Sequence, residues 1–465
     1  MKPDALRVQA VHLGATPAEA EAWTWIGERA VSYPRSIPPQ VLRPPKRVEK
    51  PRYLYALMLE LAPGGDPLDP MPLAMWVADM LGVKCIAVAD GESLDTWLWR
   101  VLDCCWRKGA YLCLWEGATL GFHVLLRHCA KGLADGGVTV HPMASAGGVL
   151  GVEFRWEKQT WLMADVGTMT GSERSGLRGF TGDQDISAVP CKRGVLALWR
   201  TLDSLQGFAL RTWGIGARMT VGSMAVKVLA ASLPSEPVWF RPNPLLVAMC
   251  RKGGAYRGGL VYADPYTGPA WRVDANKLYT WALSQGLPTR SALGRCCKDG
   301  VERDGIYVCR IDGVSDIPTP LATWPNYPAR FCKQSRRGVS GLTCLPYSEV
   351  AGLRALGYKV EPLFGWVVTE HVDTSGFVDG LIRAQSSTER GTPEHALAKR
   401  LANALYGKLG ERPDRTDVVY AAEAPDESWW PFVTTSDVIL PGLWVRRTTR
   451  YRPYHHVDAA AVITA

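Results

Sequence analysis

The sequence predicts a multidomain protein in which an α/β region is followed by an α+β region. Its 465 residues exceed the roughly 250–300 residues at which single hydrophobic cores usually stop growing. Strand and helix patterns alternate between residues 52 and 235, which is typical of an α/β layer. From residue 236 onward short strand patterns dominate, and a compact helical segment follows them, which favours an α+β arrangement.

The composition is that of a folded globular protein. Apolar residues make up 47% and charged residues 21%, so a packed core is expected and general disorder is not. No apolar run approaches the ~18–20 residues of a membrane span, and the N-terminus lacks the apolar core of a signal peptide. We therefore expect a cytoplasmic protein with no membrane partner.

Charge and cysteine usage narrow the classes of function. A net charge of +8 is compatible with an anionic partner, and ordinary surface charge explains it equally well. The 12 cysteines include no Cys-x-x-Cys pair, which excludes the usual zinc ribbon and zinc finger patterns. Reduced, mostly buried thiols are the expected state of these side chains.

The N-terminal segment, residues 1–51, is predicted to contain one helix and a basic, proline-rich arm. Thr16 can cap the helix, Pro17 suits its first position, and Glu19 suits the positive end of its dipole. Because prolines resist both helix and sheet, residues 34–51 are expected to be extended. The basic side chains of this arm could contact nucleic acid; a solvated linker is the alternative.

The following regions are divided into elements by their apolar periodicity. In the α/β region, strands are expected at 53–61, 84–89 and 110–115, and helices at 94–106, 121–130 and 195–205. In the later region, strands are expected at 260–262, 305–311 and 360–368, and a helix at 393–406.

A first candidate site surrounds Asp274, where a strand-like segment turns into a helix. A carboxylate at a strand end is well placed to hold Mg²⁺, which prefers oxygen ligands and keeps substrate phosphates in its shell. Tyr279, at the start of the next helix, could then flank a bound nucleotide. The alternative is a turn in which Asp274 only caps the helix.

A second candidate site lies on the predicted helix 393–406. Lys399, Asn403 and Tyr406 occupy positions i, i+4 and i+7, which share one face of a helix. Lysine can neutralise a triphosphate, and tyrosine can pack against a base or sugar. A surface helix that ends at Gly407 is the alternative.

Together these segments resemble two motifs of family B DNA polymerases. Asp274-x-x-x-Leu278-Tyr279 is similar to their motif A, and Lys399-x-x-x-Asn403-x-x-Tyr406-Gly407 is similar to their motif B. An upstream segment also matches a third motif of the family, the Tyr-x-Gly-Gly element that joins the exonuclease and polymerase domains. That segment is Tyr256-Arg257-Gly258-Gly259. Three motifs in the family order are a specific signal.

The resemblance implies a fold and a domain order. A ribonuclease H-like exonuclease domain would occupy residues 52–235, and the palm and fingers, with an insertion and without a thumb, would occupy residues 236–465. The long interval between Asp274 and Lys399 is similar to the protein-primed branch found in phages and plasmids, in which an insertion engages a terminal protein. For a phage-encoded chain the location would be the cytoplasm of the bacterial host.

The resemblance also implies roles for individual residues. Asp274 would be the catalytic metal ligand for two Mg²⁺ ions, with Mn²⁺ as a possible substitute, and Tyr279 would be the steric gate against a 2′-OH. The other residues of the dNTP site would be Arg383, Lys399, Asn403 and Tyr406. The residues that approach the primer–template DNA would be Tyr256, Arg257, Gly258 and Gly259.

The chain departs from the family where proofreading carboxylates are expected. Two-metal exonuclease chemistry needs carboxylates from three motifs. The corresponding positions hold Met58 and Glu60 in the first motif, Glu116 and Leu120 in the second, and Cys191 to Val195 in the third. An exonuclease-like domain without exonuclease activity is therefore expected.

A further departure concerns motif C, Asp-Thr-Asp, which carries the second metal carboxylate. Asp458 is followed by Ala460 where that ligand would stand, and residues 461–465 resemble the helix that precedes motif C. A second polymerase chain that carries motif C and a thumb is the partner this departure predicts. The leading hypothesis is thus a DNA polymerase, or the N-terminal part of a split one. The alternative is a catalytically inactive polymerase-fold protein that binds DNA or serves as a replication scaffold.

Overall fold

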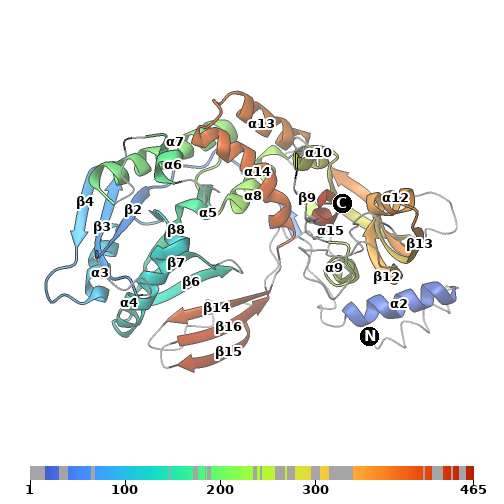
Figure 1. Ribbon diagram of the computed structural model, residues 1–465, viewed down its shortest axis with the longest axis horizontal. Helices are drawn as coiled ribbons and strands as arrows, with labels where there is room; N and C mark the ends of the chain where they lie inside the picture. The colour runs from blue at the N-terminus through green and yellow to red at the C-terminus, as the bar shows by residue number, and fades with distance from the viewer. Residues whose placement is uncertain are drawn as a thin grey trace.

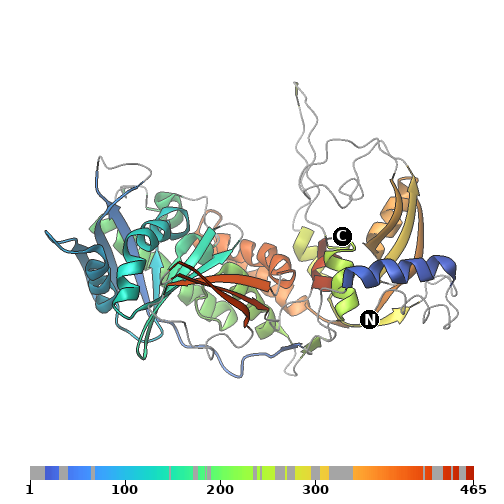
Figure 2. The same cartoon turned by 90° about the horizontal axis from the view of Figure 1, so that it is seen from below.

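The structure is a computed structural model, and the residues it describes fall into several ranges. They are 16–30, 40–63, 69–145, 148–170, 176–183, 185, 190–233, 238–240, 243–256, 268–269, 278–294, 304–313, 339–411, 414–420, 433–440, 443–449 and 457–464. The molecule is elongated and arched (Figures 1 and 2). A larger body surrounds a ten-stranded sheet, a smaller body surrounds a four-stranded sheet, and helices join the two.

The ten-stranded sheet has the order β15-β16-β14-β6-β7-β8-β5-β2-β3-β4. Its centre is parallel, because β5 pairs with both β2 and β8 in the same direction, and every other pair is antiparallel. The strands are β2 (Leu54–Leu61), β3 (Pro72–Asp79), β4 (Gly82–Ala87), β5 (Tyr111–Leu114), β6 (Thr139–Ser145), β7 (Gly148–Trp156), β8 (Gln159–Asp165), β14 (Asp414–Tyr420), β15 (Val433–Leu440) and β16 (Leu443–Thr449).

Helices cover both faces of this sheet because successive side chains of β2 point to opposite sides. Tyr55 and Leu57 pack in one core with α3 (Leu94–Cys104) and α4 (Phe122–Asp135). Ala56 and Met58 pack in another core with α7 (Lys192–Trp213) and α8 (Val221–Ser232). The short helices η1 (Gly117–Gly121), α5 (Val166–Thr170) and α6 (Leu177–Thr181) complete this body. The predicted α/β region is confirmed.

Strands β14 to β16 join this sheet from a distant part of the chain. Tyr420 of β14 pairs with Val140 of β6, and β14, β16 and β15 then extend the sheet outward. Residues from the range in which palm and fingers are expected therefore add to the sheet of the preceding range.

The smaller body is built on an antiparallel sheet of order β10-β13-β11-β12. Its strands are β10 (Leu287–Gly294), β11 (Gly305–Gly313), β12 (Val339–Pro346) and β13 (Lys359–Val372). Helices α2 (Pro17–Ala30) and α9 (Pro244–Arg251) pack on one side, and α12 (Tyr347–Ala355) packs on the other. The ring of Trp23 stacks on that of Phe364 at 4.2 Å between centroids, which fixes α2 to this sheet.

The N-terminal helix begins as the sequence predicts. The backbone N–H of Glu19 donates to Thr16 Oγ1 at 3.2 Å, and the N–H of Thr16 donates to Glu19 Oε2 at 2.6 Å. This reciprocal pair is a capping box, which satisfies two donors that a helix start leaves open.

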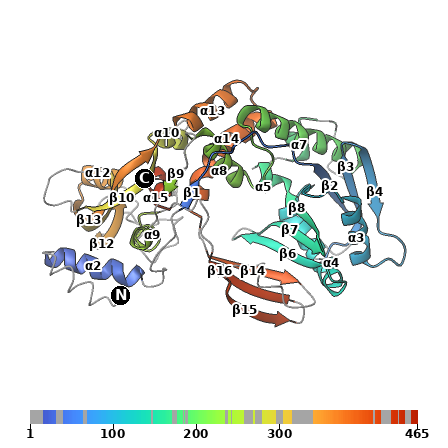
Figure 3. The same ribbon diagram turned by 180° about the vertical axis from the view of Figure 1, so that it is seen from behind.

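The described part of the proline-rich arm, residues 40–51, is anchored at several points rather than free in solvent. Strand β1 (Gln40–Leu42) pairs with β9 (Val238–Phe240), as Figure 3 shows near the middle of the molecule. Glu49 forms an ion pair with Arg218, and the side chain of Gln206 exchanges two hydrogen bonds with the backbone of Arg52. These contacts fasten the end of the arm to α7 and to the segment between α7 and α8.

Four helices lie between the two bodies. They are α10 (Leu278–Ser284), α13 (Ser375–Ser386), α14 (Pro393–Leu409) and α15 (Val457–Thr464). The last confirms that the segment expected to precede motif C is helical, and the α+β character of the later region is confirmed. The predicted strand 260–262 lies outside the described residues. Among the helices that are described, none combines the length and apolarity needed to cross a membrane.

Candidate functional site

Helix α14 separates a buried face from an exposed face, as the periodicity of its sequence predicts. Thr392 Oγ1 accepts from the N–H of His395 at 3.3 Å, and Pro393 occupies the first turn, so the helix begins at a well-formed cap. The buried face belongs to the core shared with α7 and α8 and comprises Leu397, Ala398, Leu401, Ala402 and Leu405. Lys399 and Asn403 are exposed on the other face, and Tyr406 is half-buried beside them.

Two aromatic residues predicted for the nucleotide site are in direct contact. The rings of Tyr279 and Tyr406 stack at 4.4 Å between centroids with an interplanar angle of 15°. Tyr279 lies in the first turn of α10, so the expected helix start is confirmed. Burial, together with the hydrogen bond to Tyr279, raises the pKa of Tyr406 to about 12, so its hydroxyl keeps its proton at neutral pH.

Tyr256 supports the end of α14. The phenol ring of Tyr256 packs so closely against Gly410 that a side chain at position 410 would clash with Tyr256 Oη. Burial raises the pKa of the Tyr256 hydroxyl. Arg251 Nη2 donates to the carbonyl oxygens of Gly410 and Glu411 at 3.1 and 2.8 Å. Helix α9 and the turn after it therefore hold the C-terminal end of the helix that carries Lys399. The predicted DNA contact of Tyr256 stays a prediction.

Arg383 lies on α13, which forms a hairpin with α14. His395 Nδ1 is 3.1 Å from the carbonyl oxygen of Gln385, so the end of α13 lies beside the start of α14. Arg383 and Lys399 are each exposed and lie within about one helical turn of this contact. The structure thus brings Arg383, Lys399, Asn403 and Tyr406 to one helical hairpin, with Tyr279 packed against it.

Four predicted residues lie outside the described residues: Asp274, Arg257, Gly258 and Gly259. The predicted metal ligand therefore has no described surroundings. Within the described part of the chain, no group of three or more histidine, cysteine, aspartate or glutamate side chains could hold a metal ion.

In the larger body, the positions predicted to correspond to exonuclease carboxylates hold apolar side chains and two glutamates, Glu60 and the exposed Glu116. Met58 and Val195 are buried in the core between β2 and α7. Cys191 caps α7, because its Sγ accepts from the N–H of Gly194 at 3.4 Å. Glu60 Oε2 accepts from Trp76 Nε1 at 2.8 Å.

Asp165, a buried carboxylate at the end of β8, was not among the residues predicted from the sequence. Its exposure is 3%, and it lies beside Leu114 at the carboxyl ends of the parallel strands. Three donors surround it: the N–H of Ala118 at 3.1 Å, and the N–H and hydroxyl of Thr168 at 2.7 and 3.0 Å. These bonds fix the turns that follow β5 and β8, which gives Asp165 a structural role. The only sequence signal was an aspartate at the end of an apolar strand.

We predict that the protein has no 3′→5′ exonuclease activity, because the aligned positions supply too few carboxylates to hold two metal ions. Incubation of labelled single-stranded DNA with Mg²⁺ or Mn²⁺ should leave its length unchanged. Degradation that disappears in Glu60→Ala would contradict the prediction and would assign Glu60 to an active site.

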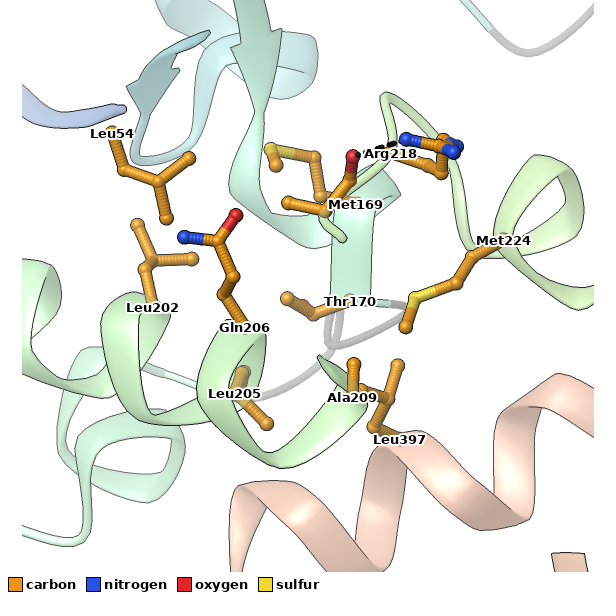
Figure 4. Close-up of a pocket in the computed structure, with 11 residues that line it drawn as sticks. Leu54, Met169, Thr170, Leu202, Leu205, Gln206, Ala209, Arg218, Met224 and Leu397 are labelled. Carbon is orange, nitrogen blue, oxygen red and sulfur yellow. Dashed lines mark hydrogen bonds between the residues drawn. The ribbon is translucent and has the colours of Figure 1, made fainter. Parts of the chain in front are cut away.

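A small cavity lies where the larger body meets α14 (Figure 4). Its volume is about 30 Å³, enough for a water molecule and too small for a nucleotide. The lining side chains are mostly apolar and come from β2, α5, α7, α8 and α14 and the segment between α7 and α8: Leu54, Met169, Thr170, Leu202, Leu205, Gln206, Ala209, Ala217, Arg218, Met224 and Leu397. The cavity is therefore a small gap in the packing between α14 and the larger body rather than a substrate site.

No protein-family model and no curated protein matches the sequence. Solved structures do match. Phi29 DNA polymerase in a ternary complex with primer-template DNA and incoming nucleotide superposes with a TM-score of 0.60 at 17% identity, covering 90% of this chain and 76% of that one.

Two other structures of the same polymerase give similar values. The complex with single-stranded DNA has a TM-score of 0.57 at 17% identity, and the post-translocation complex with primer-template DNA has 0.59 at 16% identity. Each covers 89% of this chain and 75% of that one. At this identity the likeness establishes the architecture, so the chain has the fold of Phi29 DNA polymerase, as its resemblance to family B DNA polymerases predicts.

Proposed function

We propose that the protein is a DNA-directed DNA polymerase, or one part of such an enzyme, that adds dNTPs to a primer 3′ end. The observation that carries this proposal is the exposed face of α14, where Lys399 and Asn403 lie in line with Tyr406, and Tyr406 stacks on Tyr279. The solved structures with this fold contain primer-template DNA, single-stranded DNA or an incoming nucleotide, which supports DNA and dNTPs as partners.

Each residue of this face has a role that suits its chemistry. Lys399 and Arg383 neutralise the triphosphate from the two arms of the helical hairpin. Asn403 supplies hydrogen bonds one turn further along the same face. Because the rings of Tyr279 and Tyr406 touch, a nucleotide enters beside the stack or separates it, and Tyr279 then packs under the sugar.

Asp274 is the residue that would hold Mg²⁺, or Mn²⁺ in its place. When bound, two such ions stabilise both the attacking and the leaving oxygens of a nucleotidyl transfer. The transfer needs at least a second carboxylate, and the described part of the chain offers no cluster of metal ligands. A partner chain with motif C and a thumb remains a prediction.

The four-stranded sheet suggests the type of priming. Strands β10 to β13 lie between motif A and motif B in the sequence, in the interval where protein-primed polymerases carry their insertion. We assign this sheet and α12 to that insertion, with a terminal protein as its partner. A catalytically inactive protein that binds DNA as a replication scaffold is the competing function.

Primer extension decides between the two functions. We expect extension of a labelled primer–template by the purified chain, alone or together with a protein that carries the Asp-Thr-Asp motif, and loss of extension in Asp274→Ala. Binding of primer–template without extension under either condition would contradict the polymerase and favour the scaffold.

The steric gate gives a more specific expectation. Replacing Tyr279 by alanine should raise ribonucleotide incorporation relative to deoxynucleotide incorporation, because the ring that would block a 2′-OH is gone. Tyr279→Phe is the matched control, since it keeps the ring and its stacking on Tyr406 and should keep the selectivity. Equal selectivity in all three proteins, measured as the ratio of kcat/KM values for dNTP and rNTP, would refute the assignment.

A further inference from the structure

A group of exposed tryptophans lies far from the candidate nucleotide site, at a corner where α3 ends beside the β7–β8 hairpin. Trp106 follows α3 and is 65% exposed, and Trp156, the last residue of β7, is 39% exposed. Gln159 Nε2 donates to the carbonyl oxygen of Trp106 at 3.1 Å, which ties the two segments together. The corner lies on the side of the sheet covered by α3 and α4, and α14 packs with α7 and α8 on the other side (Figure 1).

The indole ring of Trp156 is held in a fixed orientation. Trp99 of α3 meets Trp156 edge to face at 5.0 Å between centroids and 81° between planes. On its other side Trp99 meets the buried Trp161 at 5.6 Å and 73°. Trp156 is therefore supported from within the core while a large part of its surface faces water. Large exposed aromatic surface that is rigidly supported is unusual outside binding sites.

Positive charges accompany the exposed rings. The guanidinium of Arg107 lies 4.3 Å from the ring centroid of Tyr53 and 5.7 Å from that of Trp106. Lys108 and Lys158 are exposed in the two connecting segments.

Acidic side chains lie at the same corner. Glu157, in the hairpin turn, and Asp103, on α3, are exposed, and Asp79 accepts a hydrogen bond from Tyr53 Oη at 2.8 Å, beside Arg107. Arg155 forms an ion pair with Glu153, so these two side chains together add no net charge to the corner. The corner thus combines exposed indole rings with cations that lie directly beside them.

We propose that this corner binds single-stranded nucleic acid, with unpaired bases stacked on Trp106 and Trp156 and phosphates held by Arg107, Lys108 and Lys158. Aromatic side chains interleaved with cations are the recurring solution for binding single strands without sequence preference. The site is separate from the nucleotide face of α14 and does not depend on polymerase activity. The guanidinium of Arg107 lies 5.7 Å from the centroid of the Trp106 ring, so a base stacked on Trp106 would bring its phosphate within reach of a cation, which favours nucleic acid as the partner.

Crosslinking tests the location directly. Full-length protein is irradiated with a single-stranded oligonucleotide that contains 5-iodouracil, and crosslinked peptides are identified by mass spectrometry. We expect crosslinks at Trp106 or Trp156, also in Lys399→Ala. Crosslinks confined to other peptides would overturn the proposal.

Binding measurements test the energetics. In fluorescence anisotropy with labelled oligo(dT), the double variant Trp106→Ala/Trp156→Ala should bind about tenfold more weakly or worse, because each lost stacking contact is costly. Leu293→Ala is the control: Leu293 is also exposed, at 56%, and lies on β10 in the smaller body. Unchanged affinity in the double variant, or equally tight binding of blunt duplex DNA, would overturn the proposal.

A charge variant keeps the test informative if the tryptophan variant unfolds. Arg107→Gln/Lys158→Gln leaves the rings in place and should reduce the slope of log Kd against log salt by about 1.4, as expected for two lost phosphate contacts on a single strand. An unchanged slope would count against the site. Loss of binding to another protein, with oligonucleotide affinity intact, would assign the corner to a protein partner instead.

Discussion

Replacing Lys399 by alanine is expected to weaken dNTP binding by roughly 1.5–3 kcal/mol, or about 10- to 150-fold, because a charge-assisted contact with the triphosphate is lost. The side chain is exposed on α14 while the opposite face of the helix is buried, so the substitution should leave the fold intact. The measurement is an equilibrium titration of a dNTP in the presence of primer–template.

Two further variants make this result specific. Lys359→Ala removes an exposed lysine from β13, in the smaller body, and should leave dNTP affinity unchanged. Arg383→Ala should also weaken binding, because its exposed guanidinium on α13 is the second cation of the helical hairpin. Unchanged dNTP affinity in Lys399→Ala would refute the nucleotide site on α14.

The second large effect is expected from the buried face of the same helix. Leu401 has 0% exposure and lies in the core that α14 shares with α7 and α8. Leu401→Ala should lower the free energy of unfolding by about 2–5 kcal/mol, through lost burial and the cavity that remains. A shift of the urea midpoint, followed by circular dichroism, measures it.

Asn403→Ala is the matched control for this experiment. Asn403 lies on the exposed face of α14, and exposed substitutions of this kind usually change stability by less than about 0.5 kcal/mol. Equal midpoints for Leu401→Ala and Asn403→Ala would contradict the packing of α14 described above. Leu401→Ala is expected to change the stability of the fold, and Lys399→Ala is expected to change dNTP affinity. Together the two results distinguish the structural face of α14 from its nucleotide-binding face.

Elements with strong local periodicity could be predicted from the sequence. Strand β2, helix α3 and helix α14 were expected near their observed positions. The two helices repeat apolar residues with the helical period, and β2 is a short, nearly continuous apolar run, as expected for a strand buried on both faces. The pairing of Tyr420 with Val140 and the ion pair between Glu49 and Arg218 could not be predicted. Periodicity reports which face of an element is buried, and it carries no information on which distant segment buries it.

In the candidate site, too, features within one helix could be predicted and contacts between distant segments could not. The shared face of Lys399, Asn403 and Tyr406 follows from helical geometry alone. The contact of Tyr279 with Tyr406 joins residues that are far apart in sequence; the family resemblance assigned both to one nucleotide site and did not predict their stacking. Tyr256 was expected at DNA, and its ring also supports the end of α14 at Gly410. The role of Asp274 rests on its sequence motif.

The way in which β14 completes the larger sheet has a consequence for biosynthesis. Val140 of β6 pairs with Tyr420 of β14, and the two residues are separated by roughly 280 residues of chain. A ribosome that translates about 5–20 residues per second needs on the order of 15–55 s to synthesise that interval. During that interval the nascent chain presents an open β-edge, the kind of surface that pairs with other chains and aggregates. Slow elongation or low chaperone capacity should therefore reduce the yield of this protein through self-association on the ribosome, long before any catalytic residue matters.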